Sequence, residues 1–231
     1  MAIIEAVKHI REGIREACLR SGRDPAEVTL MGVSKFHGLA ELEEAWKGGI
    51  RLFGENRVQE AAEKFTVFKE KHPEAEVHMI GSLQRNKAKA AAALFDGIQS
   101  VDRDVLIDEL GGLTSGREKP LRVLLELHTG EDSKTGYPDT DSLCRAAERV
   151  LAYPGLLLKG LMTMAPYTED QKTIRASFRA LASAKALLES RFPGLDWSCL
   201  SMGMSGDFEI AIEEGSTLVR IGTAIFGERH L

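Results

Sequence analysis

The hydrophobic positions of this chain alternate between two spacings. Near the N-terminus, Ile3, Val7, Ile10 and Ile14 recur every three or four residues, a spacing that predicts one apolar face of an amphipathic helix. Further along, short continuous runs rich in valine, isoleucine and leucine, such as 28–35, are followed by stretches with helical spacing. Such runs, when they are bounded by polar residues, predict strands that are buried on both faces.

Eight strand patterns follow the N-terminal helix, with helical patterns between them. The predicted strands are 28–35, 51–56, 76–82, 97–102, 122–129, 156–164, 196–204 and 217–226. The predicted helices are 39–47, 58–71, 84–95, 103–110, 139–152, 170–192 and 208–214. Strands that alternate with helices indicate a parallel sheet, and about eight of them match a (β/α)8 barrel. A doubly wound open sheet is the alternative, but the Gly-x-Gly-x-x-Gly turn typical of its first strand is absent.

We expect one domain, residues 1–231, because no linker rich in proline, glycine or serine divides the chain. The predicted last strand runs almost to Leu231 and leaves no room for a helix of its own. The N-terminal helix is therefore expected to take that place in the outer ring of the barrel.

Composition narrows the class of protein. The chain has 231 residues, is 43% hydrophobic and has a formal net charge of -5, which gives no electrostatic case for nucleic acid binding. No apolar run approaches the ~20 residues of a membrane span, and the early Glu5 argues against a secretory signal. Cys18, Cys144 and Cys199 are scattered, as is typical of a cytoplasmic protein.

Polar residues gather where the predicted strands end, which is where barrels place their active sites. Asn56 and Asp102 end the second and fourth predicted strands, the segment 130–136 follows the fifth, and the segment 160–166 ends the sixth. Asn56 or Asp102 taken alone could simply cap the next helix. The convergence of so many such residues on one rim predicts a functional site.

Lys35 closes the first predicted strand. At the mouth of a pocket its ammonium would be partly desolvated, which lowers the pKa of a lysine and leaves a nucleophilic amine. The alternative is that Lys35 only extends its amine to solvent.

The last two strands end in small, hydroxyl-rich turns, at 200–207 and 219–227. Barrels often bind phosphate between the loops that follow strands 7 and 8. Arg220 lies within the last apolar strand, where a buried charge needs an anion or a ligand. A reactive lysine, a phosphate cup and an inward arginine together fit pyridoxal 5′-phosphate (PLP), bound as a Schiff base.

The chain resembles the pyridoxal-phosphate homeostasis protein family, the single-domain relatives of the alanine racemase barrel. The resemblance rests on the segments 33–35, 53–59, 81–87, 200–205 and 215–227. It implies that Lys35 is the PLP lysine, that Arg220 faces the pyridine nitrogen and that Asn56 lies near the ring. It implies a phosphate site made of Ser201, Gly203, Ser205, Gly222 and Thr223.

One position departs from the family pattern. Leu127-His128 stands where the family usually has Val-Asn, so His128 is either a substitution in the packing or an added acid/base group. The histidines form no metal-ligand spacing, and we propose no metal.

An arginine against the pyridine nitrogen keeps it unprotonated and weakens the ring as an electron sink, which argues against a transaminase. A racemase needs acid/base groups on both faces of its substrate, and none of Tyr137, Tyr153 and Tyr167 matches the tyrosine of the racemases. We therefore expect no catalytic residue and a monomeric protein that carries or buffers PLP in vitamin B6 and amino-acid homeostasis. Amino acids and apo PLP-dependent enzymes are its candidate partners. The alternatives are a weak amino-acid racemase and a Schiff-base aldolase that acts on a phosphorylated sugar.

Overall fold

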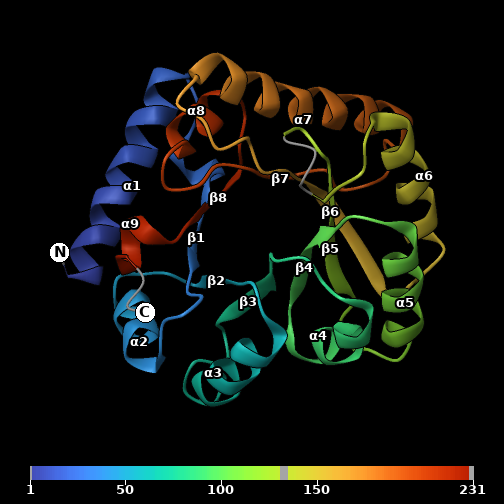
Figure 1. The fold of residues 1–231 in the computed structure, drawn as a ribbon, viewed down its shortest axis with the longest axis horizontal. Helices are drawn as coiled ribbons and strands as arrows, with labels where there is room; N and C mark the ends of the chain where they lie inside the picture. The colour runs from blue at the N-terminus through green and yellow to red at the C-terminus, as the bar shows by residue number, and fades with distance from the viewer. Residues whose placement is uncertain (1, 131–134, 229–231) are drawn as a thin grey trace.

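The computed structural model describes residues 2–130 and 135–228, which form a closed barrel of parallel strands surrounded by helices (Figure 1). The strands follow one another in chain order, and the pairing of β1 with β8 closes the barrel. The strands are β1 (Thr29–Val33), β2 (Leu52–Glu55), β3 (Glu76–Met79), β4 (Gly97–Val101), β5 (Leu121–Glu126), β6 (Leu156–Met162), β7 (Cys199–Ser201) and β8 (Leu218–Ile221). The predicted (β/α)8 architecture is confirmed.

Helices form the outer ring. The α-helices are α1 (Ile3–Arg20), α2 (Leu39–Lys47), α3 (Val58–Lys71), α4 (Ala88–Leu94), α5 (Asp104–Thr114), α6 (Thr140–Leu151), α7 (Gln171–Arg191), α8 (Phe208–Glu213) and α9 (Thr223–Phe226), with short 3₁₀ turns at η1 (Pro25–Glu27) and η2 (Arg85–Lys87). The predicted apolar face of α1 is buried, and this helix packs against α2, α8 and α9. The N-terminal helix completes the outer ring, as the sequence predicted (Figure 1).

The prediction for the last strand was wrong beyond Ile221. The backbone changes direction at Gly222, and the next four residues form the single turn α9. Short apolar runs do not separate strand from helix by period, and Ile225 and Phe226 are buried in the core between helices and barrel. The eighth strand therefore does have a helical turn of its own, which lies beside α1 in the ring.

The two faces of each strand carry different residue types. Outward side chains such as Phe53 join the helices in one large core, where Phe53 lies 5.6 Å from Phe65 between ring centroids. Toward the barrel axis, Leu218 belongs to a small separate apolar cluster and Arg220, two residues on, continues the same face. Strand alternation thus places a buried arginine inside the barrel, next to the rim.

None of the helices in the described part of the chain is long and apolar enough to cross a membrane. The three cysteines are unpaired, with Cys18 and Cys144 buried. Within residues 2–130 and 135–228, no three histidine, cysteine or acidic side chains are grouped in a way that could hold a metal ion.

Candidate functional site

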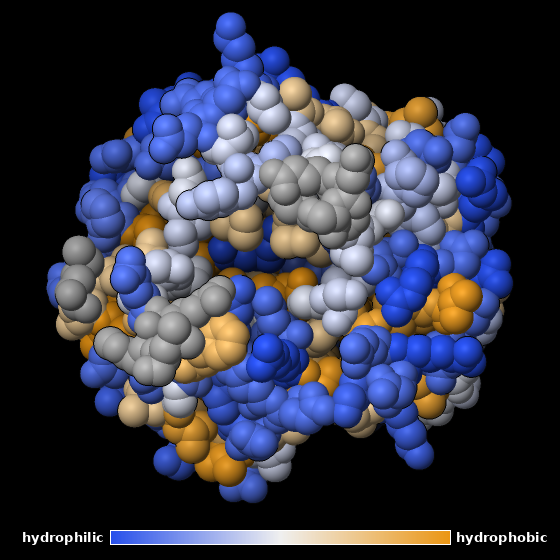
Figure 2. Space-filling model, in the orientation of Figure 1, coloured by the Kyte–Doolittle hydropathy of each residue, from blue (hydrophilic) through white to orange (hydrophobic). Residues whose placement is uncertain are grey.

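A cavity of about 380 Å³ opens at the carboxyl ends of the strands. The face of the molecule seen in Figure 2 is hollowed near its centre, with hydrophilic side chains on the floor and hydrophobic ones beside them. Six of the eight predicted site residues line the cavity, namely Lys35, Asn56, Ser205, Arg220, Gly222 and Thr223. They come from the ends of β1, β2, β7 and β8, so the structure brings together residues from both halves of the chain.

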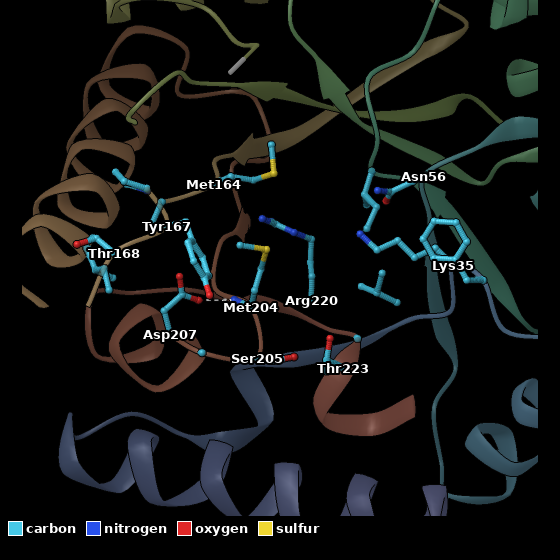
Figure 3. Close-up of a pocket in the computed structure, with 18 of the residues that line it drawn as sticks. Lys35, Asn56, Met164, Tyr167, Thr168, Met204, Ser205, Asp207, Arg220 and Thr223 are labelled. Carbon is cyan, nitrogen blue, oxygen red and sulfur yellow. Dashed lines mark hydrogen bonds between the residues drawn. The ribbon is translucent and has the colours of Figure 1, made fainter. Parts of the chain in front are cut away.

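Lys35 lies two residues beyond β1, rather than at the strand end itself, in a turn over residues 34–37. The N–H of His37 donates to the carbonyl oxygen of Ser34 at 3.1 Å and closes the turn. Figure 3 shows the partly buried Lys35 side chain reaching into the cavity toward Arg220. The amine therefore points into the space that a ligand in the cavity would occupy.

Arg220 is almost fully buried in the barrel. Its Nη1 donates to Ser201 Oγ at 2.7 Å and its Nη2 donates to the carbonyl oxygen of Thr163 at 2.8 Å. Burial lowers the pKa of the guanidinium to about 10, against the favourable charges of Asp207 and Glu126. The group is still a cation at neutral pH, and the two hydrogen bonds fix its plane.

Ser201 and Gly203, the other two predicted phosphate residues, make contacts of their own within the barrel. Neither is among the described residues that line the cavity. Ser201 is fully buried between Arg220 and Gln99, to whose Oε1 its hydroxyl donates at 2.6 Å. Gly203 has φ +95, and a Cβ there would lie 2.6 Å from the Cβ of Ala211. The serine therefore orients the arginine, and the glycine lets α8 pack closely.

The hydrogen bonds of Ser201 continue across the barrel. The amide nitrogen of Gln99 lies 3.0 Å from His78 Nδ1, which accepts its hydrogen when the amide is oriented with Oε1 toward Ser201. His78 is buried, and desolvation lowers its pKa to about 3. A neutral polar row thus connects the floor of the cavity, at Arg220, to the opposite end of the barrel.

Ser205, Gly222 and Thr223 form one wall of the cavity. The two hydroxyl groups lie next to each other in Figure 3, and the N–H of Ala224 donates to Ser205 Oγ at 3.3 Å. Asp207 lies at the edge of this wall, where its Oδ1 accepts the N–H of Met204 at 2.5 Å. The hydroxyls offer an anion two donors in the cavity that the buried Arg220 also lines.

The remaining walls are mostly apolar. Ile80, Met164 and Met204 line them, with Asn56 beside Lys35 (Figure 3). Such walls fit the faces of an aromatic ring. Tyr167, at the rim, is 98% exposed.

Other rim residues lie outside the cavity. Asp102, the predicted residue after β4, pairs with Arg103 at 2.5 Å, and burial raises its pKa. His128 does not line the cavity either, and its Nδ1 is buried without a hydrogen bond to any described residue. Within the predicted rim segment 130–136, residues 131–134 lie outside the described residues. Sequence reasoning missed Ile174 as a cavity residue, because it lies in α7 and not near a strand end, and it did not single out Asp207 within the turn 200–207.

Glu126, at the end of β5, gives a pH-dependent prediction. It is buried, and desolvation raises its pKa from 4.5 to about 7. Between those pH values the folded state keeps a proton that the unfolded state has released, so the free energy of unfolding falls as pH rises. Between pH 5 and pH 8 we expect the free energy of unfolding of the wild-type protein to fall by up to about 3 kcal/mol, and Glu126→Gln to abolish this fall. Urea unfolding at pH 5 and pH 8 measures it.

The exposed Glu63 provides a matched control for this experiment. Glu63→Gln should leave the difference in unfolding free energy between pH 5 and pH 8 unchanged. An equal pH dependence in the wild-type protein and the Glu126→Gln variant would contradict the prediction.

Fold and site together define a barrel of the alanine racemase class. Residues 7–230 match the family model of the alanine racemase N-terminal domain. The chain is 40% identical over 231 residues to the pyridoxal phosphate homeostasis protein of Vibrio alginolyticus, covering 99% of this chain and 98% of the relative. It is also 40% identical to the protein of the same name from Escherichia coli K12, over 98% of this chain and 97% of that one. The chain belongs to the pyridoxal phosphate homeostasis protein family.

Solved structures agree with this assignment. PipY of Synechococcus elongatus, determined with PLP bound, superposes with a TM-score of 0.81 at 35% identity and covers 93% of this chain and 99% of its own. The alanine racemase of Streptomyces coelicolor matches with a TM-score of 0.70 at 19% identity, over 97% of this chain and 58% of its own. At that identity the racemase shows the shared fold alone.

Proposed function

We propose that this chain binds PLP in the cavity, covalently through the Lys35 amine, and serves PLP homeostasis without steady enzymatic turnover. The observation that carries the proposal is the placement of Lys35, the buried Arg220 and two hydroxyls around one cavity. PLP-bound PipY and the homeostasis proteins support it as relatives. When bound, PLP supplies an aldehyde carbon that reacts with amines and a ring that can withdraw electrons.

The donor set of the cavity fits this cofactor. The Lys35 amine can hold the aldehyde carbon, and the hydroxyls of Ser205 and Thr223 can donate to the phosphate. Arg220 can donate to the pyridine nitrogen but has no acceptor, so the ring nitrogen stays unprotonated. The residues therefore hold the cofactor while limiting its electron withdrawal.

The proposal is tested by adding PLP to the purified protein and recording the absorption spectrum before and after borohydride. We expect a stoichiometric band at the violet end of the visible spectrum, and borohydride should replace it with a pyridoxyl group fixed on the protein. A phosphorylated-sugar aldolase that uses Lys35 would show no such band as purified, before PLP is added. If PLP neither changes the spectrum nor becomes fixed by borohydride, the proposed function fails.

The cavity wall formed by Ser205, Gly222 and Thr223, which we call the hydroxyl wall, gives another prediction. Ser205→Ala combined with Thr223→Val should weaken PLP binding at least tenfold and leave pyridoxal binding nearly unchanged, because each lost hydrogen bond to a charged group costs about 1.5–3 kcal/mol. Equilibrium titration with both ligands measures the effect. Equal losses for PLP and pyridoxal would mean that this wall does not bind the phosphate.

Ser201 serves as the comparison. The resemblance assigned its hydroxyl to the phosphate, whereas its contacts are with Arg220 and Gln99. We therefore expect Ser201→Ala to affect PLP and pyridoxal to the same degree, since it acts on the ring through Arg220.

The setting of this function is also part of the proposal. We infer a monomer that works in the cytoplasm, with amino acids and apo PLP-dependent enzymes as the partners that take up its cofactor. The partly exposed rim around Tyr167 and Phe36 leaves the cavity accessible to them.

A further inference from the structure

The turn that carries Lys35 has a conformation that its own residues do not favour. Phe36, the third residue of the turn, has φ 69, whereas no positive φ is recorded for Lys35. One positive φ at the third position is the pattern of a type II turn, which favours glycine there. A bulky aromatic residue is an outlier in this region. Contacts from elsewhere in the fold must therefore hold the turn.

Those contacts begin at Lys64 in α3. Its amine donates to three oxygens, namely the Ser34 carbonyl at 2.8 Å, Glu55 Oε1 at 2.7 Å and Glu60 Oε1 at 3.0 Å. We call these four residues the Lys64 cluster. Three acceptors match the three hydrogens of an ammonium group.

The cluster reaches the peptide groups on both sides of Lys35. On one side, Lys64 binds the carbonyl oxygen of Ser34 directly. On the other side, the N–H of Phe36 donates to Glu60 Oε1, the same oxygen that Lys64 holds. Both neighbours of Lys35 in the chain are thus fixed by one amine.

The cluster is buried, so its bonds are not exchanged freely for water. Glu55 is 0% exposed and Lys64 is 8% exposed. The hydroxyl of Ser34 also donates to Glu55 Oε1, at 2.6 Å. Desolvation raises the pKa of Glu55, and the adjacent Lys64 opposes this effect. Removal of one member of a buried charged pair strongly destabilises the other. Lys64 and Glu55 therefore depend on each other to stay in this arrangement.

Lys64 lies on the helix side of the barrel, in α3. Glu60 and Lys64 are four residues apart and share one face of α3, while Glu55 ends β2 with its side chain turned outward to that helix. Lys64 is not among the described residues that line the cavity. Any effect on the site must therefore pass through the turn.

We propose that Lys64 is a positioning residue, which fixes both peptide groups flanking Lys35 and so aims the Lys35 amine into the cavity. The inference rests on the proposed function, because it concerns the amine that holds PLP. It adds that the orientation of this amine is set from outside the cavity, by the Lys64 cluster.

The test separates binding from the covalent step. Pyridoxine 5′-phosphate carries an alcohol in place of the aldehyde, so it can occupy the cavity without reacting with Lys35. For each variant, the Kd of this compound is measured by titration, and the rate of PLP capture at Lys35 by borohydride quenching and peptide mass spectrometry.

Lys64→Met is expected to slow PLP capture about tenfold or more, since displacement of a reacting group by about an ångström costs up to 10²-fold. The Kd of pyridoxine 5′-phosphate should stay within about threefold, well under the tenfold that 1.4 kcal/mol represents. Lys64→Arg, which keeps a cation and N–H donors, should recover part of the rate. The matched control is Lys69→Met on the same helix, which breaks the pair with Asp96 and should capture PLP at the wild-type rate.

Glu60→Ala provides a second variant at a less buried position, with 22% of its side chain exposed. It removes the acceptor of the Phe36 N–H and should slow PLP capture in the same way as Lys64→Met. It therefore tests the proposal even if Lys64→Met does not fold. Capture at the wild-type rate in a folded Lys64→Met or Glu60→Ala protein would overturn the proposal. Equal losses of capture and of pyridoxine 5′-phosphate binding would do so as well, because they would indicate a general structural defect.

Failure of the proposed function would look different. The wild-type protein would then neither capture PLP nor bind pyridoxine 5′-phosphate. The positioning role is decided in that case on the ligand-free protein, by hydrogen exchange of the Phe36 amide. Exchange at least tenfold faster in Lys64→Met than in Lys69→Met supports it, and equal exchange overturns it.

Discussion

Lys35→Ala is expected to abolish covalent capture of PLP. Lys35 lines the same cavity as Ser205 and Thr223, and alanine has no group that can bond to the aldehyde carbon. After incubation with PLP and borohydride reduction, peptide mapping of the wild-type protein should place the pyridoxyl group on Lys35. The variant should carry no label at stoichiometric level, and the band at the violet end of the spectrum should be absent.

Two outcomes would contradict this assignment. One is a pyridoxyl group that maps to another lysine in the wild-type protein, such as Lys87. The other is a Lys35→Ala protein that keeps the absorption band. Lys89→Ala is the control, since Lys89 is exposed on α4 and outside the cavity.

The second large effect is a low rate of racemisation. General acid–base catalysis contributes about 10²–10⁴-fold, and a racemase needs such groups on both faces of its substrate. Besides Lys35 and Arg220, the titratable side chains that line the cavity within the described residues are His37, Tyr167 and Asp207. We expect the protein with PLP bound to racemise amino acids more slowly than ordinary enzyme rates of about 1–10³ per second, by about the factor that general acid–base catalysis contributes.

The contacts of those three side chains carry this expectation. His37 stacks on Phe226 with ring centroids 5.0 Å apart, Asp207 accepts the N–H of Met204, and Tyr167 is 98% exposed. Chiral chromatography after long incubation with alanine or serine at high protein concentration measures the rate. Turnover at ordinary enzyme rates would favour the weak-racemase alternative, and Tyr167→Phe would then show whether the exposed phenol takes part.

The architecture was predictable because each strand of the barrel is an apolar run and each helix has its own spacing. Lys35, Asn56 and Arg220 were also within reach of sequence reasoning. They are polar or charged residues at the ends of, or inside, apolar strands, where burial without a ligand is costly.

The exact position of each strand end was not predictable in the same way. β7 contains only Cys199–Ser201, so the cavity wall begins three residues after it, at Met204 and Ser205. Ser201 therefore faces the barrel interior, although its residue type suits a phosphate site equally well. A shift of one residue in strand register would turn this side chain to the helix side of the barrel, and composition does not determine that register.

The Lys64 cluster was hidden for a different reason. Glutamate and lysine four residues apart are ordinary on the exposed face of a helix. Only the docking of α3 beside the turn after β1 makes Glu60 and Lys64 part of the site. Contacts of this kind depend on how distant segments pack, and a pattern along the chain does not contain them.

The pairing of β1 with β8 has a consequence for the order of folding. Met31 lies opposite Arg220 in this pairing, so Lys35 meets the wall around Thr223 only after the chain has been synthesised through β8. Such distant pairing is slow to form and leaves strand edges exposed in the meantime. A ligand that requires both ends of the barrel binds the finished fold and stabilises it by mass action. PLP supply in the cell would then influence how much newly made protein completes its folding.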